Sequence, residues 1–295
     1  MMLLCCYAVM RLCGYAFEPL ILWAINIHTM TANQIIYQVD AFTSEPFKGN
    51  PAGVCILEKE MPDEWMQKIA AELHVSETAF ISGGRDEYKI RYFTPESEVP
   101  LCGHATLSSA HIMFETGIVE KNGVITFSSK AGILKTHYSD GWVIMNFPVY
   151  DLKQEPIPDD IFNYIAITPV EFYKTGHGWT LVLLRNEEEV INLNPDFRAM
   201  KNSAYGDLIV TAPSSDPRYD FCVRCFAPAL GIDEDPVTGS AHCALVPFWH
   251  KKRGKTEFIS HQVSKRGGIL KVSLVGDRVE IAGQAVTILE AGLLV

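Results

Sequence analysis

Short apolar runs and alternating apolar and polar residues recur along the chain, which predicts a molecule built mainly of β-strands. In the first half we expect strands over residues 35–42, 52–57, 78–82 and 88–93, followed by further strands up to Phe147. A helix is expected after Pro62, because apolar residues recur there at helical spacing. A second helix is expected from near Gly103 to about Glu115.

The second half repeats this order of elements. We expect strands over residues 180–184, 208–211 and 219–226, a helical stretch over 195–204, and a helix from about Gly239. Pro247 lies inside that helix and should kink or end it, because proline lacks the amide hydrogen that a helix interior uses. Turns are expected at Gly49-Asn50-Pro51 and at its counterpart Gly176-His177-Gly178, and residues 154–158 are the best candidate for a linker between the halves.

Several motifs occur twice at nearly constant separation. The segment from Arg91 to Pro95 returns 133 residues later, and Gly103 returns 136 residues later as Gly239. Matching order and spacing indicate a duplicated unit. We therefore predict an α+β fold of two pseudo-symmetric halves, residues 30–150 and 151–295, with the C-terminal strand able to pack back on the first half. A ligand cleft is expected between the halves.

Composition narrows the classes of function. Apolar residues make up 48% of the 295 residues and charged residues 20%, which is typical of a globular protein. The net charge of −10, with no basic patch to offset it, argues against nucleic-acid binding. The eight cysteines suit a reduced, cytoplasmic protein, and Cys222 and Cys225 are expected to be strand residues rather than metal ligands.

Residues 1–29 do not follow the pattern of the rest of the chain. Their apolar run is interrupted by Arg11 and Glu18, so it is too short and broken for a membrane span. Without a positively charged start it is also a poor secretory signal. We expect an extension outside the duplicated unit, with Met30 as the more natural beginning and no association with a membrane.

Two glycines mark the most promising binding elements. Gly103 and Gly239 each stand where a helix is expected to begin. The first amides of a helix lack acceptors and carry partial positive charge, so they bind carboxylates and phosphates. Two such helix starts facing one cleft would hold a small acid without a metal ion.

The titratable residues differ between the two halves. Glu77 stands at the mouth of an apolar strand, and Gly206 is its counterpart at an offset of 129. Burial there would raise the pKa of Glu77 toward neutrality, as a reversible proton carrier requires; a surface glutamate ending a helix is the simpler reading. Asp235 likewise corresponds to an apolar residue in the first half, Val99. Acids just before a helix can also be no more than helix caps.

Four motifs in this chain closely resemble the phenazine-biosynthesis PhzF-like family. They are Phe47-Lys48-Gly49-Asn50-Pro51-Ala52-Gly53-Val54, Ser76-Glu77-Thr78-Ala79-Phe80, Cys102-Gly103-His104-Ala105-Thr106 and Asp233-Glu234-Asp235-Pro236-Val237-Thr238-Gly239-Ser240-Ala241-His242. The resemblance covers roughly residues 35–295. It implies the fold of diaminopimelate epimerase, in which each half is a curled, mostly antiparallel sheet around a central helix and the active site lies between the halves.

The resemblance also implies roles for individual residues. Glu77 would be the acid/base, with His104, Asp235 and Ser240 as polar partners, and the amides of Gly103 and Gly239 would bind the substrate carboxylate. The characterised phenazine enzyme of the family isomerises a dihydro-hydroxyanthranilate by moving a proton between ring carbons. We therefore expect an isomerase of a small carboxylate-bearing molecule, without cofactor or metal, and a homodimer.

Two other functions remain open. A racemase or epimerase could use Glu77 against Cys102, since related epimerases use one cysteine from each half; the matching place near Gly239 has no thiol, so Cys102 is expected to be a small buried residue. A non-catalytic protein could use the cleft only to bind a small acid.

Overall fold

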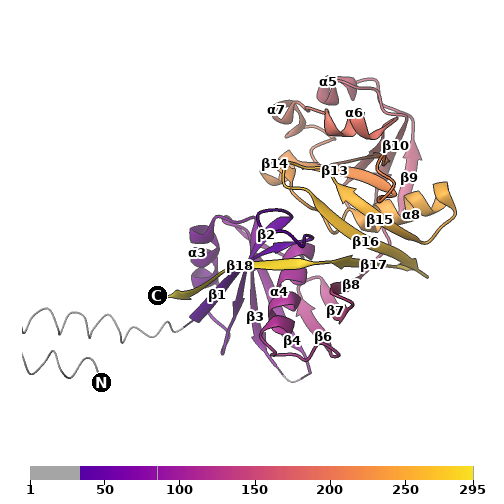
Figure 1. Ribbon diagram of the computed structural model, residues 1–295. Helices are drawn as coiled ribbons and strands as arrows, with labels where there is room; N and C mark the ends of the chain where they lie inside the picture. Colours follow the sequence, from indigo (N-terminus) through magenta and orange to yellow (C-terminus); the bar gives the residue numbers. More distant parts are fainter. Residues whose placement is uncertain (1–33, 85, 295) are drawn as a thin grey trace, which may run out of the picture. The chain divides into compact units, whose positions relative to one another are not determined.

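The computed structural model describes residues 34–84 and 86–294, so the expectations for residues 1–29 lie outside the described part. Ile36–Glu290 form one compact unit, built mostly of strands (Figure 1). The first half contains the strands β1 (Gln34–Ala41), β2 (Asn50–Ile56), β3 (Glu77–Gly83), β4 (Tyr88–Phe93), β5 (Glu98–Val99), β6 (Val124–Ser129), β7 (Gly132–Ser139) and β8 (Trp142–Pro148). Its helices are α3 (Asp63–Leu73) and α4 (Gly103–Glu115).

The second half has a similar inventory. Its strands are β9 (Leu152–Glu155), β10 (Glu171–Thr175), β11 (Thr180–Leu183), β12 (Leu208–Pro213), β13 (Phe221–Ala227), β14 (Ile232–Asp235), β15 (Glu257–Gln262), β16 (Gly268–Val275), β17 (Arg278–Gly283) and β18 (Ala285–Leu293). Its helices are α5 (Phe162–Ile165), α6 (Glu187–Ile191), α7 (Phe197–Met200) and α8 (His242–Arg253), with one 3₁₀ turn at Pro228–Leu230.

Both halves pair their strands in the same order. In the first half, β1–β2 and β3–β4 are antiparallel, β2–β3 and β4–β6 are parallel, and β6, β7 and β8 continue antiparallel. In the second half, β10–β11 and β12–β13 are antiparallel, β11–β12 and β13–β15 are parallel, and β15, β16 and β17 continue antiparallel. The predicted α+β fold of two pseudo-symmetric halves is confirmed, while the boundary between residues 150 and 151 stays a prediction.

A repeated ion pair supports the equivalence of the halves. Arg91 donates from Nε and Nη2 to the two carboxylate oxygens of Glu98, at 2.8 and 2.7 Å. Arg224 makes the same two bonds to Glu234, at 2.7 and 2.8 Å. Both pairs are largely shielded from water, and each ties the short strand that follows (β5 or β14) to its neighbour. Planar, two-bond pairing of this kind fixes geometry as well as adding energy.

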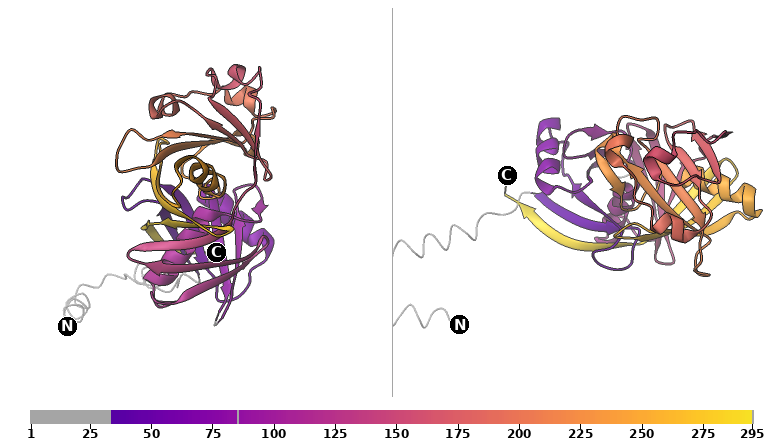
Figure 2. Two further views of the ribbon diagram at one scale, coloured as in Figure 1. Left: turned by 90° about the vertical axis from the view of Figure 1, so that its right-hand side faces the viewer. Right: turned by 90° about the horizontal axis from the view of Figure 1, so that it is seen from above.

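The helices α4 and α8 are the centres of the two halves. Nearly every residue of α4 from His104 to Phe114 is buried, and α8 is buried from His242 to Val246. In the left view of Figure 2, α8 is seen nearly end-on among the strands of the second half. One hydrophobic cluster contains residues of both helices, and β8 and β17 join the halves as antiparallel neighbours. Within residues 34–84 and 86–294, no helix is long and apolar enough to cross a membrane.

The predicted turn at Gly49-Asn50-Pro51 is only partly correct. Gly49 has a φ of +64°, and a Cβ atom on it would lie 2.1 Å from the carbonyl oxygen of Ala41, so only glycine can stand there. Asn50 and Pro51 already belong to β2. The Gly49 conformation therefore sets the point at which β2 begins and directs Asn50 into the protein interior, where it is fully buried.

Of the two effects expected of Pro247, a kink or an end of the helix, the end is wrong. The helix continues to Arg253 with Pro247 in its interior. Proline at this position leaves the carbonyl of Cys243 without its usual helical donor. The backbone N–H of Tyr150 donates to this carbonyl at 2.9 Å, so a contact from outside the helix replaces the missing bond.

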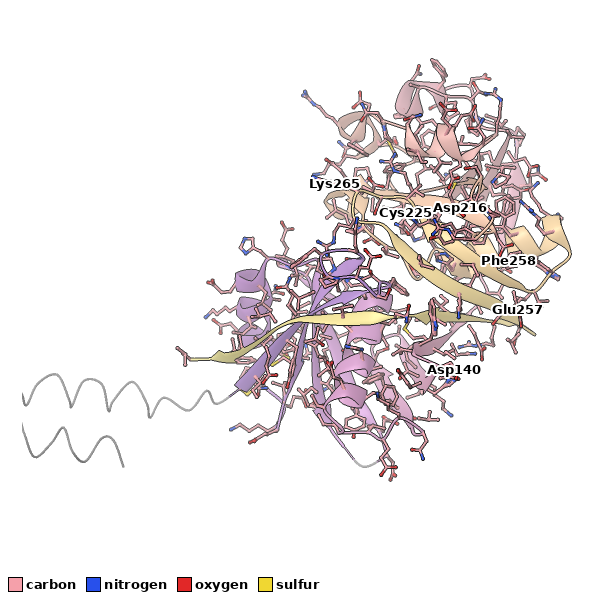
Figure 3. All side chains as sticks on the ribbon, viewed as in Figure 1. Asp140, Asp216, Cys225, Glu257, Phe258 and Lys265 are labelled. Atoms are coloured by element: carbon pink, nitrogen blue, oxygen red, sulfur yellow. The ribbon has the colours of Figure 1, made fainter. Side chains whose placement is uncertain are left out.

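Two further segments differ from the expectation. The helical stretch predicted over residues 195–204 is reduced to α7, whose start is capped by Asp196. The predicted linker is partly strand, because Gln154 and Glu155 belong to β9 and pair with β10. Cys222 and Cys225 are buried strand residues of β13, as expected; Cys225 is labelled in Figure 3.

Candidate active site

Glu77 is the first residue of β3, and this beginning of the strand lies beside the start of α4. Successive residues of a strand point to opposite faces, so Glu77 shares a face with Ala79 and Ile81. Both of these belong to the central hydrophobic cluster around α4. The side chain of Glu77 therefore points toward the central helix, and it retains 21% of its exposure. It is not the surface glutamate of the simpler reading.

His104 is the direct partner of Glu77. Its Nε2 atom lies 3.1 Å from Oε2 of Glu77, and its side chain is only 8% exposed. His104 is the second residue of α4, and the turn of the helix brings its ring against the start of β3. The structure therefore brings together the two residues that the resemblance paired.

The charge state of this pair differs from the expectation for Glu77. Burial pushes the pKa of Glu77 upward, but the charge of His104 and hydrogen bonds from His104 and Cys102 outweigh it, so the pKa lies below its usual value. Burial opposes protonation of His104, but nearby Cys102 and Glu77 raise its pKa well above the usual value. The predicted raised pKa of Glu77 is wrong, because the sequence did not reveal the imidazolium beside the carboxylate.

Asn50 connects this pair to Asp235 in the second half. Its Nδ2 atom donates to Oδ1 of Asp235 at 2.7 Å and to the carbonyl of Val237 at 2.9 Å, and lies 3.2 Å from Nδ1 of His104. The two shorter contacts use both amide hydrogens. The sulfur of Cys102 lies 3.4 Å from Nδ1 of His104. Sequence reasoning missed Asn50, although it lies in one of the four motifs.

Asp235 is held by a second layer of contacts. Thr238 donates from Oγ1 to Oδ2 of Asp235 at 2.6 Å. Gln262 donates to the backbone carbonyl of Asp235 and accepts from the Thr238 amide, at 2.7 and 2.9 Å. Burial raises the pKa of Asp235 to about 6, against the lowering effects of His104, Thr238 and Asn50. Asp235 lies in β14 and caps no helix, so the capping alternative is wrong.

The two glycines lie against each other. A Cβ atom on Gly103 would lie 3.8 Å from Cα of Gly239 and 3.9 Å from the amide nitrogen of Ser240. The first helical bond of α4 runs from the Thr106 amide to Cys102, so the Gly103 and His104 amides have no acceptor in the helix.

The helix expected from about Gly239 begins at His242, and Gly239 begins the turn that leads into it. The first bond of this turn runs from the His242 amide to the Gly239 carbonyl. His242 fixes the turn through contacts of 3.0 Å to the Thr238 carbonyl and 2.8 Å to the Ser260 hydroxyl, and burial lowers its pKa to about 4. Within the described residues, no side chain caps either helix and the Ser240 hydroxyl makes no hydrogen bond. Two uncapped helix starts therefore meet beside the Glu77–His104 pair.

Cys102 lies inside the same cluster and is fully enclosed. Burial and the charge of Glu77 raise the pKa of its thiol. Glu77, Cys102 and His104 each offer one ligand atom, and these atoms lie within 4.8 Å of one another, so the trio could hold a metal ion. Metal binding would require loss of the thiol proton and of the Glu77–His104 pairing. That no metal binds stays a prediction, which metal analysis of the purified protein would test.

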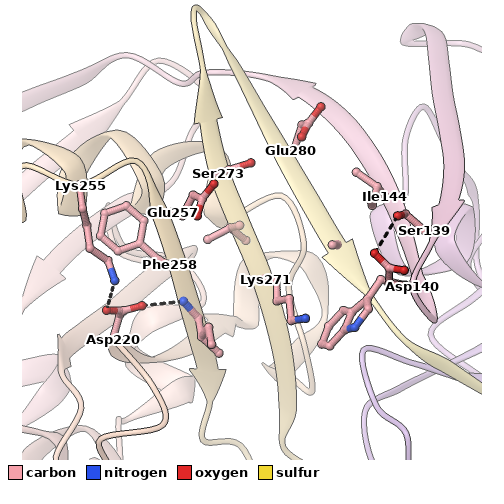
Figure 4. A pocket seen from close by; sticks show the side chains of 14 residues that line it. Ser139, Asp140, Ile144, Asp220, Lys255, Glu257, Phe258, Lys271, Ser273 and Glu280 are labelled. Atoms are coloured by element: carbon pink, nitrogen blue, oxygen red, sulfur yellow. Dashed lines mark hydrogen bonds and ion pairs between the residues drawn. The ribbon is translucent and has the colours of Figure 1, made fainter.

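The hollow drawn in Figure 4 is separate from this cluster. It has a volume of about 520 Å³ and contains none of Glu77, His104 and Asp235. Among its charged groups, Lys255 pairs with Asp220, and Lys271 lies 4.2 Å from the centre of the Trp142 ring. It offers no titratable group positioned for proton transfer next to an anion-binding helix start.

Comparisons with known proteins agree on one family. The family described as phenazine biosynthesis-like protein matches residues 39–291. An uncharacterized isomerase of Halalkalibacterium halodurans is 46% identical over 260 residues, which are 88% of this chain and 98% of that protein. The crystal structure of a phenazine biosynthesis protein of the PhzF family from Enterococcus faecalis is 38% identical, with a TM-score of 0.83 over 88% of this chain and 98% of that one.

A structure with much lower sequence identity has a similar fold. A probable proline racemase from Agrobacterium radiobacter has a TM-score of 0.59 over 88% of this chain and 93% of that chain. Its identity is 13%, so the likeness concerns the fold alone. It agrees with the epimerase-like architecture expected from the motifs.

Proposed function

The chain belongs to the phenazine biosynthesis-like protein family, and on this basis we propose that it is an isomerase that moves a proton between carbon atoms of a small carboxylate-bearing substrate without a cofactor. The family and the isomerase class were both expected from the motifs, and the comparisons confirm them. The path of the proton, the residues that carry it and the class of substrate are the proposal.

One observation carries this proposal: the Glu77–His104 pair lies beside two uncapped helix starts. The amides at Gly103 and Gly239 would bind the substrate carboxylate, because the partial positive charge of a helix start favours anions. A bound carboxylate would then present its neighbouring carbon atoms to Glu77. No other cluster in the described part of the chain combines a carboxylate base with such a binding element.

The proton would move in two steps. The low pKa of Glu77 means that it enters the reaction as a carboxylate, ready to accept a proton from a substrate carbon. When Glu77 becomes neutral, the imidazolium of His104 loses its counter-charge and can stabilise the negative charge that develops on the substrate. Glu77 then returns the proton to a different carbon on the same face, because one carboxylate serves both steps.

Asp235 and Ser240 would act from the second half. The charges of Asp235 and His104 interact, so the ionisation of Asp235 influences the charge on the imidazole. The free hydroxyl of Ser240 can bond to the substrate carboxylate beside the Gly239 amide.

The racemase alternative is less well supported. A racemase would hold the substrate carbon between Glu77 and Cys102, but the carboxylate oxygen and the sulfur lie within 4.8 Å of each other, which leaves no room for a carbon atom between them. Activity that survives Cys102→Ala is expected. The non-catalytic alternative predicts ligand binding without any hydrogen exchange at carbon.

Exchange of carbon-bound hydrogen in deuterium oxide tests the proposal. Candidate acids are incubated with the protein, beginning with the dihydro-hydroxyanthranilate that the family resemblance implies, and isomerisation and label are followed by NMR. Glu77→Gln should lower the rate by about 10²- to 10⁴-fold, because it removes the proton carrier and keeps the shape. A single carrier also predicts partial retention of the original hydrogen in the product.

The matched control is Glu87→Gln, which removes an exposed carboxylate that has no partner in the described residues. It should leave the rate unchanged. If Glu77→Gln remains folded by thermal melting and turns over substrate as fast as the wild type, the proposed mechanism is wrong.

A further inference from the structure

The register of the sheets identifies Asp207 as the counterpart of Glu77. Phe93 and Phe226 are equivalent, because both lie in the segment that repeats at an offset of 133. Phe93 pairs with Thr78, and Phe226 pairs with Leu208. The residue before Thr78 is Glu77, and the residue before Leu208 is Asp207. The counterpart expected from the sequence, Gly206, is therefore wrong by one residue, and both halves carry a carboxylate at this position.

The side chain of Asp207 points to the same side of its sheet as that of Glu77. By strand alternation it shares a face with Ile209, which belongs to the central cluster around the two helices. Leu208 and Val210 face the other cluster, beneath α5, α6 and α7. Asp207 thus faces the central helix of its half, as Glu77 faces α4.

The partners of the two carboxylates are different. Glu77 pairs with the imidazole of His104. The residue equivalent to His104 in the second half, at the offset of 136, is Ser240. Aspartate and serine are both shorter than glutamate and histidine, and no hydrogen bond joins Asp207 to Ser240 in the described residues. Oδ1 of Asp207 is inaccessible to solvent and has no hydrogen-bond partner. Burial raises the pKa of Asp207, and no charged neighbour opposes the effect.

The buried side-chain oxygens without hydrogen-bond partners indicate which contacts a ligand could supply. Six buried side-chain oxygens in the described residues have no hydrogen-bond partner. Three are hydroxyls, which can also donate. Oε2 of Glu77 lies 3.1 Å from Nε2 of His104 and so has an ionic partner, which leaves Oδ1 of Asn50 and Oδ1 of Asp207. An amide oxygen and ionised carboxylates can only accept. Asn50 is the first residue of β2, and Asp207 directly precedes β12.

We propose that Asp207 is a substrate-binding residue that accepts a hydrogen bond from an N–H or O–H group of the substrate. This inference rests on the proposed function and deepens it, because it defines the substrate as a small acid that carries a donor group as well as its carboxylate. The helix starts hold the carboxylate, and Asp207 binds the donor from the second half. Buried polar groups without partners are costly, and a donor on the ligand removes that cost.

Binding of three matched acids to the full chain tests this assignment. Propionate, lactate and alanine share a three-carbon carboxylate and carry no donor, a hydroxyl and an ammonium group, respectively. The measurements are made in Glu77→Gln, so that turnover is slow and residue 77 carries no charge. Lactate and alanine should bind about tenfold to a hundredfold more tightly than propionate. Asp207→Ala should abolish this preference and leave propionate binding unchanged.

Two further variants separate binding from other roles. Asp159→Ala removes an exposed carboxylate of the same half and should keep the preference. Asp207→Asn keeps an acceptor without the charge, so it should retain part of the lactate preference and lose the alanine preference. Because the carboxylate has no partner in the protein, Asp207→Asn should melt at the wild-type temperature or above it.

Three results would overturn the assignment. Equal affinities for the three acids in Glu77→Gln mean that Asp207 does not select a donor. A clearly lower melting temperature of Asp207→Asn means that its role is structural. Loss of carbon hydrogen exchange from only one enantiomer of a substrate in Asp207→Asn means that Asp207 is a second base. None of these outcomes bears on the effect of Glu77→Gln on turnover, so failure here is distinguishable from failure of the proposed function.

Discussion

At the scale of the residue, the tertiary neighbours decide the chemistry of each acid. Glu77 is half-buried, which by itself would favour its neutral form, but His104 at 3.1 Å reverses the direction of the pKa shift. Asp235 has hydrogen bonds from Asn50 and Thr238, yet its enclosure still raises its pKa to about 6. Two carboxylates of one site thus differ in proton affinity because only one of them touches the imidazole.

The raised pKa of Asp235 predicts a pH-dependent contribution to stability. The folded pKa is about 6 and the usual value 3.8, so the folded protein binds this proton more tightly than the unfolded chain. The stability that Asp235 contributes is therefore present at pH 3.8 and below and is lost as pH rises toward 6. Relative to Asp235→Asn, the wild type should lose up to about 3 kcal/mol between pH 4 and pH 7.

Chemical denaturation of both proteins at the two pH values measures this difference. Subtracting the free energy of unfolding of Asp235→Asn from that of the wild type removes the contribution of groups that do not interact with Asp235. A difference that stays constant between pH 4 and pH 7 would show that the pKa of Asp235 is not raised.

At the scale of the element, short backbone features position the site. Gly49 lets the chain turn sharply before β2 and so places Asn50 against His104 and Asp235. Arg266 fixes the same turn, since it donates to the carbonyls of Gly49 and Lys48 and to the carboxylate of Asp40. In α8, the amide of Tyr150 replaces the bond that Pro247 removes, so the helix can extend past proline.

Gly49→Ala should be strongly destabilising. The added methyl group would meet the Ala41 carbonyl at 2.1 Å and the Thr43 side chain at 2.8 Å, at a φ of +64° that alanine disfavours. We expect a loss of about 2 kcal/mol or more in the free energy of unfolding.

Gly176→Ala is the matched control, because Gly176 begins the corresponding turn and no atom lies within 4 Å of its added methyl group. Its stability should change by less than about 1 kcal/mol. The comparison is made by thermal and urea unfolding. Similar losses for the two variants would contradict the role given to the Gly49 turn.

At the scale of the whole molecule, the site exists only where the two halves meet. Asn50 from the first half bonds Asp235 and Val237 of the second, and Gly103 and Gly239 lie in contact. The last strand also returns to the first half, where Thr287 contacts His111 and Glu115 of α4. A homodimer and a cytoplasmic location stay predictions; light scattering on the full chain would measure the former.

A double-mutant cycle across the two glycines measures the contact between the halves. Gly103→Ala alone should be nearly neutral, since its methyl group meets Gly239 at an ordinary 3.8 Å. Gly239→Ala should cost more, because its methyl group would lie 3.1 Å from the Phe42 ring. In the double variant both methyl groups enter one narrow gap, so the loss should exceed the sum of the single losses by about 1 kcal/mol. Additive losses would show that the two helix starts are not in contact.

The sequence by itself determined the α+β architecture of two pseudo-symmetric halves and the family, because strand patterns, repeat offsets and four motifs are local features of the chain. It also located Glu77, His104, Asp235, Gly103, Gly239 and Ser240 as candidates. Only the tertiary structure decided which residues touch, since Asn50 bonds Asp235, which lies 185 residues away in the chain. The pKa of Glu77 depends on burial and neighbouring charge, and the equivalence of Asp207 and Glu77 depends on strand register. Both arise only when distant segments pack together.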